Sequence, residues 1–180
     1  MAPDAPDRYA PFRWTRVDLD RHAGDSARLS DIHERWQDRR RMADLPQWDI
    51  SVLESMPDAT IPFVNVIDVN DGVPPFRYRF FGSGLANMHL FELTHQTTDA
   101  IEPAGFRRLC EDQHVMTIER RAPVMFINEV PTKVDGLAMS HLMLRLPYSD
   151  DGSRVTQILT VEDVLGKPEE VWERFRKMPV

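Results

Sequence analysis

Two stretches in the first half of the chain look like strands, the first by its β-branched content and the second by its alternation. Residues 63–69 read Phe-Val-Asn-Val-Ile-Asp-Val, and residues 76–80 alternate aromatic side chains with arginines. Because successive side chains of a strand point to opposite faces, each stretch predicts a strand, the second with an aromatic face and a wet face. The segment 70–75, which holds one glycine and two prolines, predicts the turn of an antiparallel hairpin.

The last third of the chain predicts three more strands, joined as antiparallel neighbours by short polar segments. They cover residues 124–130, 137–146 and 155–162. In the middle strand, Leu142 and Leu144 share one face with Ala138 and Leu146. His141 and Arg145 point the other way. We expect the leucine face to belong to the core and the polar face to meet solvent.

Helical spacing marks the segments that flank and separate these strands. A first helix is expected from Ser26 or Ser30, either of which can cap it, to Ala43, and Pro46 stops it. Its apolar side consists of Leu29, Ile32 and Trp36. A short helix is expected within 85–93.

Two further helices are expected in the second half. The longer one begins at Pro103 and ends before Pro123. The spacing typical of one helix face, three or four residues, separates Phe106 from Leu109 and Cys110, and Cys110 from His114. A final helix opens at Pro168 and carries Val171, Trp172 and Phe175.

The element order predicts an α+β fold in one domain. Residues 1–25 hold three prolines without sustained periodicity and predict a flexible or loosely packed arm. Residues 26–180 form the domain, with a core at about 48–163. We expect a five-stranded antiparallel sheet in which the long insert brings the first pair beside the last strand. Helices cover one face, and an N-terminal and a C-terminal helix flank the sheet.

Composition narrows the classes of partner. The 180 residues carry a net charge of −7, which opposes binding to a phosphate backbone, so a nucleic-acid partner is not expected. The lone cysteine, Cys110, rules out an internal disulfide and fits a reducing compartment. No apolar run is long enough to cross a bilayer or to act as a signal peptide, so we expect a cytoplasmic protein.

Several local phrases, in this order, resemble the PAS superfamily, and more narrowly a single-domain PAS-like family common in alphaproteobacteria. The phrases are Trp36 followed by Arg39–Arg41, Leu45–Ile50, Phe76–Leu85, Leu93-Thr94 and Leu146–Gly152. They extend over about residues 30–163. Trp48 and His95 depart from the pattern of that family. The resemblance implies a cupped antiparallel sheet with helices over it, used in bacterial signalling to bind a small ligand, to pair with itself or to dock a partner. It implies no particular chemistry.

The residues offer two candidates for cofactor chemistry. Cys110 stands in Arg-Arg-Leu-Cys-Glu-Asp, which does not match a flavin-adduct motif, so we interpret it as a small buried hydrophobe on a helix. His114 lies in the segment from which PAS haem sensors take their axial ligand, and it is the candidate for a haem ligand. The other histidines show no metal-ligand spacing, so no metal site is expected.

The main functional prediction is a sensory or protein-interaction module without catalysis and without a cofactor. The expected lining of the cup is Tyr78, Phe80, Phe126, Leu142 and Leu144. These side chains either fill the cup or surround a ligand that Tyr78 would orient. A signalling protein is the expected partner, and the N-terminal helix predicts a homodimer. The alternatives are a haem-dependent gas or redox sensor and a small isomerase or dehydratase that uses Asp68 and His141.

Overall fold

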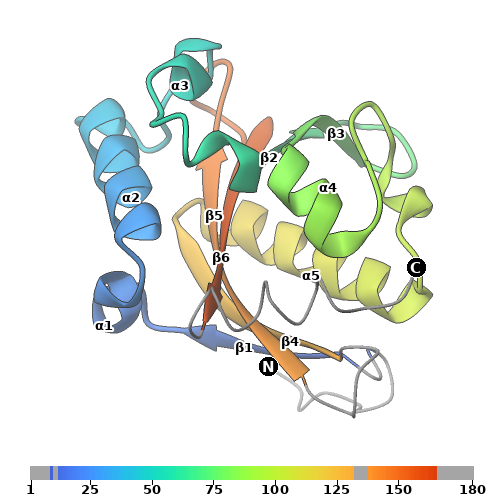
Figure 1. The fold of residues 1–180 in the computed structure, drawn as a ribbon. Coiled ribbons are helices and arrows are strands. Elements are labelled where there is room, and N and C mark those ends of the chain that lie inside the picture. The colour runs from blue at the N-terminus through green and yellow to red at the C-terminus, as the bar shows by residue number, and fades with distance from the viewer. Residues whose placement is uncertain (1–8, 10–11, 132–137, 166–180) are drawn as a thin grey trace.

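The computed structural model describes residues 9, 12–131 and 138–165 of the chain. Six strands form one antiparallel sheet in the order β1-β4-β5-β6-β2-β3 (Figure 1). Their bounds are β1 Arg13–Val17, β2 Val64–Val69, β3 Phe76–Phe81, β4 Val124–Pro131, β5 Ala138–Tyr148 and β6 Gln157–Leu165.

The five strands expected from the sequence are confirmed, together with their pairing. The β2–β3 hairpin lies beside β6, which runs antiparallel to β2 from Val64, opposite Val161, to Asp68, opposite Gln157. The last three strands follow one another as antiparallel neighbours. The insert between β3 and β4 makes this crossover possible, as the element order predicts.

The sixth strand, β1, corrects the prediction of a loosely packed arm for residues 13–17. It pairs antiparallel with β4, from Arg13 opposite Glu129 to Val17 opposite Met125. A five-residue run gives little pattern to read, and the strand forms because β4 offers it a sheet edge. Two short turns of helix follow, α1 at Leu19–His22 and η1 at Ala23–Asp25.

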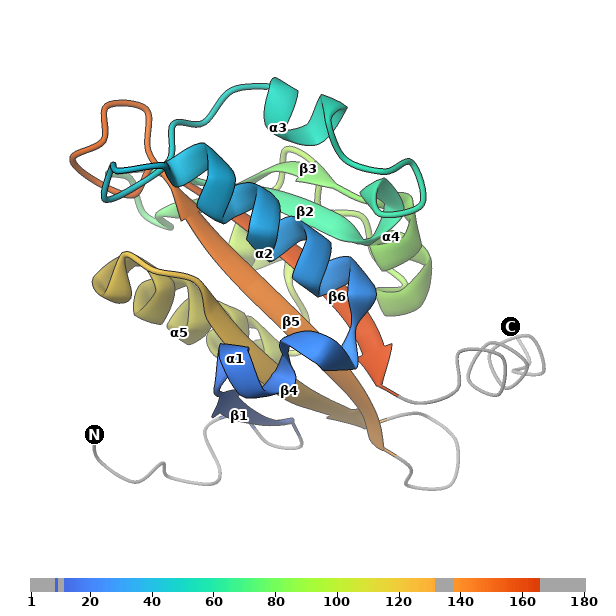
Figure 2. The same ribbon diagram turned by 90° about the vertical axis from the view of Figure 1, so that its left-hand side faces the viewer.

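Helix α2 (Ala27–Arg40) covers one face of the sheet. The backbone N–H of Leu29 donates to Ser26 Oγ at 3.2 Å, so Ser26 is the cap. The three apolar residues expected on one side, Leu29, Ile32 and Trp36, are all buried against the sheet. In Figure 2 this helix crosses in front of β5 and β6.

Two helices cover the opposite face. They are α4 (Ser83–His89) and α5 (Ala104–Arg120), which with the 3₁₀ turn η3 (Thr98–Ala100) connect β3 to β4. Figure 1 shows α2 and α5 on opposite sides of β5 and β6. The remaining short elements are α3 (Ser51–Glu54) and η2 (Ile61–Phe63). The helix expected from Pro168 lies outside the described residues.

The sheet therefore has two buried faces, and the expectation of a solvent-facing polar side on β5 is wrong. Leu142 and Leu144 pack under α2, while His141 and Arg145 are buried on the face that α4 and α5 cover. We call the space enclosed by the sheet, α4 and α5 the cup. The alternation of polar and apolar residues along a strand shows that its two faces differ in polarity. Whether a face is exposed to solvent depends on which helices pack over it.

Candidate functional site

The cup is lined with polar side chains from three adjacent strands. Every second residue of β4, β5 and β6 faces it, because strands present alternate side chains to the same side. The fully or almost fully buried polar residues on this face are Asn128, His141, Arg145, Thr160 and Glu162, and Gln113 faces them from α5. A core built only for stability would hold apolar residues at these positions.

Arg145 is the centre of one hydrogen-bond network. Its side chain donates to Gln113 Oε1 from Nε at 3.2 Å and from Nη2 at 3.0 Å, and to Thr160 Oγ1 from Nη1 at 2.8 Å. Gln113 Nε2 in turn donates to Asn128 Oδ1 at 2.7 Å. Among the described residues no carboxylate forms a salt bridge with Arg145, which is 1% exposed. Burial therefore lowers the pKa of this guanidinium.

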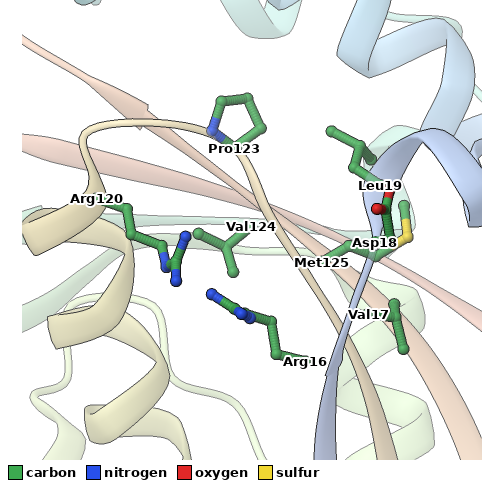
Figure 3. A pocket seen from close by; sticks show the side chains of 8 residues that line it. All are labelled: Arg16, Val17, Asp18, Leu19, Arg120, Pro123, Val124 and Met125. Atoms are coloured by element: carbon green, nitrogen blue, oxygen red, sulfur yellow. The ribbon is translucent and has the colours of Figure 1, made fainter. Parts of the chain in front are cut away.

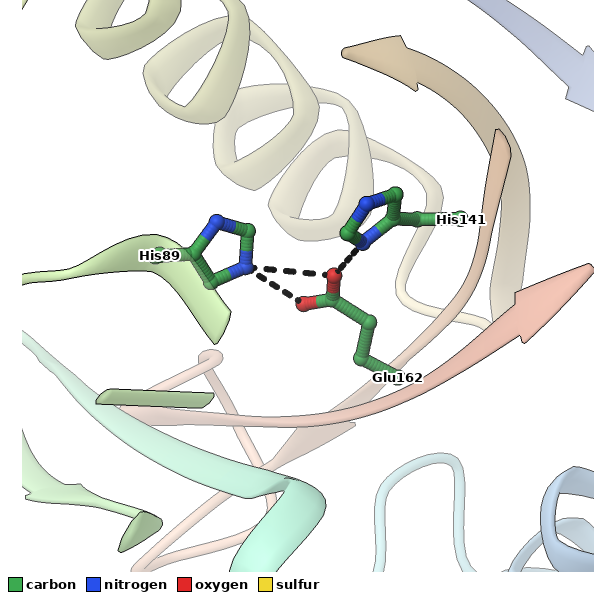
Figure 4. A group of neighbouring side chains, drawn as sticks. All are labelled: His89, His141 and Glu162. Atoms are coloured by element: carbon green, nitrogen blue, oxygen red, sulfur yellow. Dashed lines mark hydrogen bonds and ion pairs between the residues drawn. The ribbon is translucent and has the colours of Figure 1, made fainter. Parts of the chain in front are cut away.

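A second cluster joins α4, β5 and β6 (Figure 4). Both carboxylate oxygens of Glu162 lie close to Nε2 of His89, at 3.2 and 3.3 Å, and Oε1 also contacts Nδ1 of His141. The two imidazoles stack with ring centroids 5.5 Å apart. Burial by itself opposes ionisation of Glu162, but the two imidazoles outweigh it and hold the pKa of this carboxyl below its ordinary value.

A small cavity of about 20 Å³ lies beside these two clusters. Its polar lining comes from Asn65, Tyr78, His89, Cys110, Arg145 and Glu162, and its apolar lining includes Phe81, Phe91 and Phe106. A space of this size holds about one water molecule. Ligand pockets measure roughly 300–1,000 Å³, so the cup as it stands is filled by side chains and accepts a ligand no larger than an ion or a water.

Several buried polar atoms of this face have no hydrogen-bond partner in the described part of the chain. They are Asn65 Oδ1, His141 Nε2 and both ring nitrogens of His114. Each such atom costs roughly 1–3 kcal/mol of stability relative to a satisfied one. Unsatisfied atoms gathered on one face indicate a site that has a role other than packing.

The five residues expected to line the cup do not share one face. Tyr78 lines the cavity, and burial raises the pKa of its phenol above the ordinary value. Phe126 packs edge-on against Trp14, which belongs to the cup side. Phe80, Leu142 and Leu144 instead pack on the α2 side. The prediction of a common lining is wrong for these three, and for Leu142 and Leu144 the reason is that the other face of β5 is the one turned toward the cup.

Phe80 departs from its predicted face for a local reason. The pairing of β2 with β3 steps from Val66 opposite Phe80 to Ile67 opposite Tyr78, so Arg79 is an extra residue in β3. Such a β-bulge shifts the alternation by one position. Tyr78 and Phe80, which strict alternation places together, therefore lie on opposite sides of the sheet.

The two cofactor candidates occupy helix α5. Cys110 is buried, as predicted, and lines the cavity, where burial raises the pKa of its thiol to about 12. His114 is also buried, but it is not among the residues that line the cavity. Its ring packs against Phe76 with centroids 4.8 Å apart. Haem would therefore need a rearrangement of the cup to reach this imidazole.

The pair expected for an isomerase or dehydratase is not brought together. Asp68 forms a salt bridge with Arg79, at 2.7 Å between Oδ1 and Nη2, on a partly exposed part of the sheet. His141 contacts Glu162 inside the cup instead. The side chains that His141 contacts are thus Glu162 and His89, which sequence reasoning missed. The period-two recurrence of polar residues on β4, β5 and β6 was the signal that could have found this face.

A second, open depression of about 290 Å³ lies where β1 meets β4 and the end of α5. The side chains of Arg16 and Arg120 point toward each other across it (Figure 3). Both arginines are exposed, and long exposed side chains define no fixed ligand geometry. We assign no site to this depression.

Comparison with known proteins gives likeness in fold. No protein-family model and no curated protein matches the sequence. The structure is similar to that of the PAS domain from Bordetella pertussis BvgS, with 11% identity, a TM-score of 0.49, and coverage of 71% of this chain and 93% of that one. It is also similar to a light-oxygen-voltage domain studied with a flavin analogue, with 12% identity, a TM-score of 0.46, and coverage of 72% and 96%.

The architecture agrees with the sequence-based prediction of one antiparallel sheet with helices over it, to which β1 adds a sixth strand. One antiparallel sheet carries the first hairpin beside the last strand, and the helices of the insert lie over the cup. Within the described residues, no helix combines the length and the apolar content needed to span a bilayer.

Proposed function

We propose that this protein is a non-catalytic sensory module of the PAS type, whose input is a change of ligand or charge inside the cup and whose output is read by a partner protein on the α2 side of the sheet. The observation that carries the proposal is the buried polar face of the cup. Its unsatisfied atoms at Asn65, His114 and His141 lower stability without adding packing, which is the mark of a site retained for its response.

The sheet connects the input to the output because each strand presents both faces. On β5, Arg145 faces the cup while its neighbours Leu144 and Leu146 pack under α2. On β6, Glu162 faces the cup and Val161 packs under α2. A packed layer does not deform freely, so a shift of the cup side chains moves the strands as a unit and changes the packing of α2.

Hydrogen exchange tests this coupling. We expect Glu162→Gln, which removes a buried charge from the cup, to change amide protection in α2 by at least about threefold, although the substitution lies on the other face of the sheet. Arg79→Gln, which alters an exposed ion pair with Asp68, is the matched control and leaves α2 unchanged. Changes confined to α4 and α5 would contradict the proposal, provided that circular dichroism shows both variants folded.

Native mass spectrometry tests the input. Protein isolated under mild conditions is expected to carry added mass that denaturation releases. Absorbance in the Soret region that disappears in His114→Ala would instead support the haem-dependent sensor, since that imidazole is the candidate axial ligand.

Homodimerisation is a separate proposal. The apolar residues of α2 that suggested it are buried within this chain, so a dimer would use the outer side of α2 or another surface. Light scattering across a range of concentrations tests it with the intact protein. Removing residues 1–44 would not, because that deletion uncovers the core beneath α2.

A further inference from the structure

We infer that His89, His141 and Glu162 form a binding site for one divalent transition-metal ion of the Zn²⁺ class. The inference rests on the proposed sensory function, since it names the ligand class of the cup. Each residue offers one ligand atom, and the three atoms all lie within 4.8 Å of one another (Figure 4). Two imidazoles and one carboxylate are the donor set of open zinc sites.

The distances suit an ion with small side-chain movements. Zinc bonds to nitrogen and oxygen measure about 2.0–2.2 Å, which puts neighbouring tetrahedral ligand atoms roughly 3.4 Å apart. Nε2 of His89 already lies 3.2 Å from Oε1 of Glu162. Nδ1 of His141 and Oε1 of Glu162 are in direct contact, and these two atoms move apart as the ion takes its place between them.

Two of the ligands stand on rigid supports and the third is adjustable. In the pairing of β5 with β6, Glu162 lies opposite Met143, two positions from His141, so the strands fix both side chains on the same face. His89 is the last residue of α4, and Leu90 after it has a left-handed backbone with φ 61°. The side chain of His89 is 10% exposed, against 1% for His141 and 2% for Glu162, so it is the ligand nearest to solvent.

The cavity supplies a fourth ligand position. His89 and Glu162 both line this space of about 20 Å³, which is sufficient for one metal-bound water. Arg145, Cys110 and Tyr78 line the same space, and the Arg145 guanidinium opposes a second positive charge. Metal ligands must be deprotonated, so binding requires neutral imidazoles and an ionised Glu162. The ion therefore displaces any proton held between these groups.

A purely structural role explains the cluster less well. The cluster places an ionisable carboxyl and two imidazoles, of which Glu162 and His141 are 2% and 1% exposed, where apolar side chains would pack without a desolvation cost. The bound ion would connect the end of α4 to β5 and β6, and so change the layer that the proposed signal uses.

The test is metal titration of the intact chain after treatment with a chelator. Calorimetry with zinc chloride near neutral pH is expected to give one equivalent bound per chain. His141→Ala and Glu162→Gln are expected to weaken binding by at least about 100-fold, because each removes a direct ligand. The control, His33→Ala on the surface of α2, keeps the wild-type affinity. Absence of binding to the wild-type protein, or binding that all variants retain, would overturn the site.

X-ray absorption on the zinc-loaded wild-type protein keeps the test decisive if a ligand variant does not fold. Two imidazole nitrogens and a carboxylate oxygen support the assignment, and any other ligand set overturns it. The result is separable from that of the proposed function. If zinc does not bind but Glu162→Gln still alters exchange in α2, the metal site is wrong and the sensory module stands. If zinc binds but Glu162→Gln leaves hydrogen exchange in α2 unchanged, the metal site stands and the proposed sensory module is wrong.

Discussion

The guanidinium of Arg145 and the side-chain carbonyl of Gln113 form a buried pair in which a full positive charge is met by a neutral oxygen, at 3.2 Å from Nε and 3.0 Å from Nη2. A charge in such surroundings is retained at the expense of stability, because water would solvate it better. We therefore expect opposite changes in the free energy of unfolding when Arg145 or Gln113 is replaced.

Replacing Arg145 with methionine is expected to leave the free energy of unfolding unchanged or to raise it by up to about 4 kcal/mol, since an apolar chain removes the buried charge. Replacing Gln113 with alanine is expected to lower it by roughly 2–3 kcal/mol, because the charge then loses its main acceptor. Urea denaturation measures both. Gln37→Ala, on the exposed side of α2, is the control and stays within about 0.5 kcal/mol. If Arg145→Met were the more damaging change, the charge would be contributing to stability.

His114 predicts a particular dependence of stability on pH. Burial, reinforced by the charge of Arg145, holds the pKa of His114 well below 6.5. As pH falls below that value the unfolded chain binds a proton at this residue and the folded chain does not, so folding is opposed. The free energy of unfolding then decreases by up to about 1.4 kcal/mol per pH unit between about pH 6.5 and pH 5.

The substitution His114→Leu isolates this contribution. It removes the titrating group, so the slope between about pH 6.5 and pH 5 decreases by the amount that His114 supplied, while the stability at neutral pH stays the same or rises. Met42→Ala, at a side chain that is 100% exposed and does not titrate, retains the wild-type slope. Equal slopes in wild type and His114→Leu would contradict this, because they would show that the imidazole takes up a proton as readily in the folded protein as in the unfolded chain.

Trp36 predicts how strongly α2 is held to the sheet. Its indole is 1% exposed, and Nε1 donates to the carbonyl oxygen of Pro147 at 2.9 Å. Trp36→Ala is expected to cost about 3–5 kcal/mol because it leaves a large cavity. Met42→Ala, at a side chain that is 100% exposed, is the control. Chemical denaturation measures the difference, and a loss below about 1 kcal/mol would mean that α2 detaches easily.

Gly82 lies so close to the backbone of η2 that there is no room for a side chain at this position. A Cβ atom there would lie 2.4 Å from the carbonyl oxygen of Pro62 and 2.7 Å from that of Ile61, both of which are backbone atoms. Gly82→Ala is expected to cost about 1–3 kcal/mol, since the start of α4 must move away from η2. Gly72→Ala, which meets nothing within 4 Å, is the matched control. Thermal melting compares the two, and equal melting temperatures would contradict this close approach.

Much of the secondary structure could be predicted because its signals are local. The aromatic alternation at Phe76 and Tyr78, the cap at Ser26 and the apolar spacing of Ile32 and Trp36 each act within a few residues. Strand β1 could not be predicted in the same way, since its stability comes from an edge that β4 supplies more than a hundred residues later. The β-bulge at Arg79 could not be predicted either, because the residues around it follow the same alternating pattern as a regular strand.

The sequence by itself determined that five segments become strands, how these five pair, where α2 and α5 form, and that the strand around Leu142 has one polar and one apolar face. Only the tertiary structure decided that both faces are buried and that the polar one lines the cup. It also brought His89, His141 and Glu162 into contact from three separate elements. The physical reason is that alternation is a property of a single strand, whereas burial and contact depend on which distant helices pack over each face.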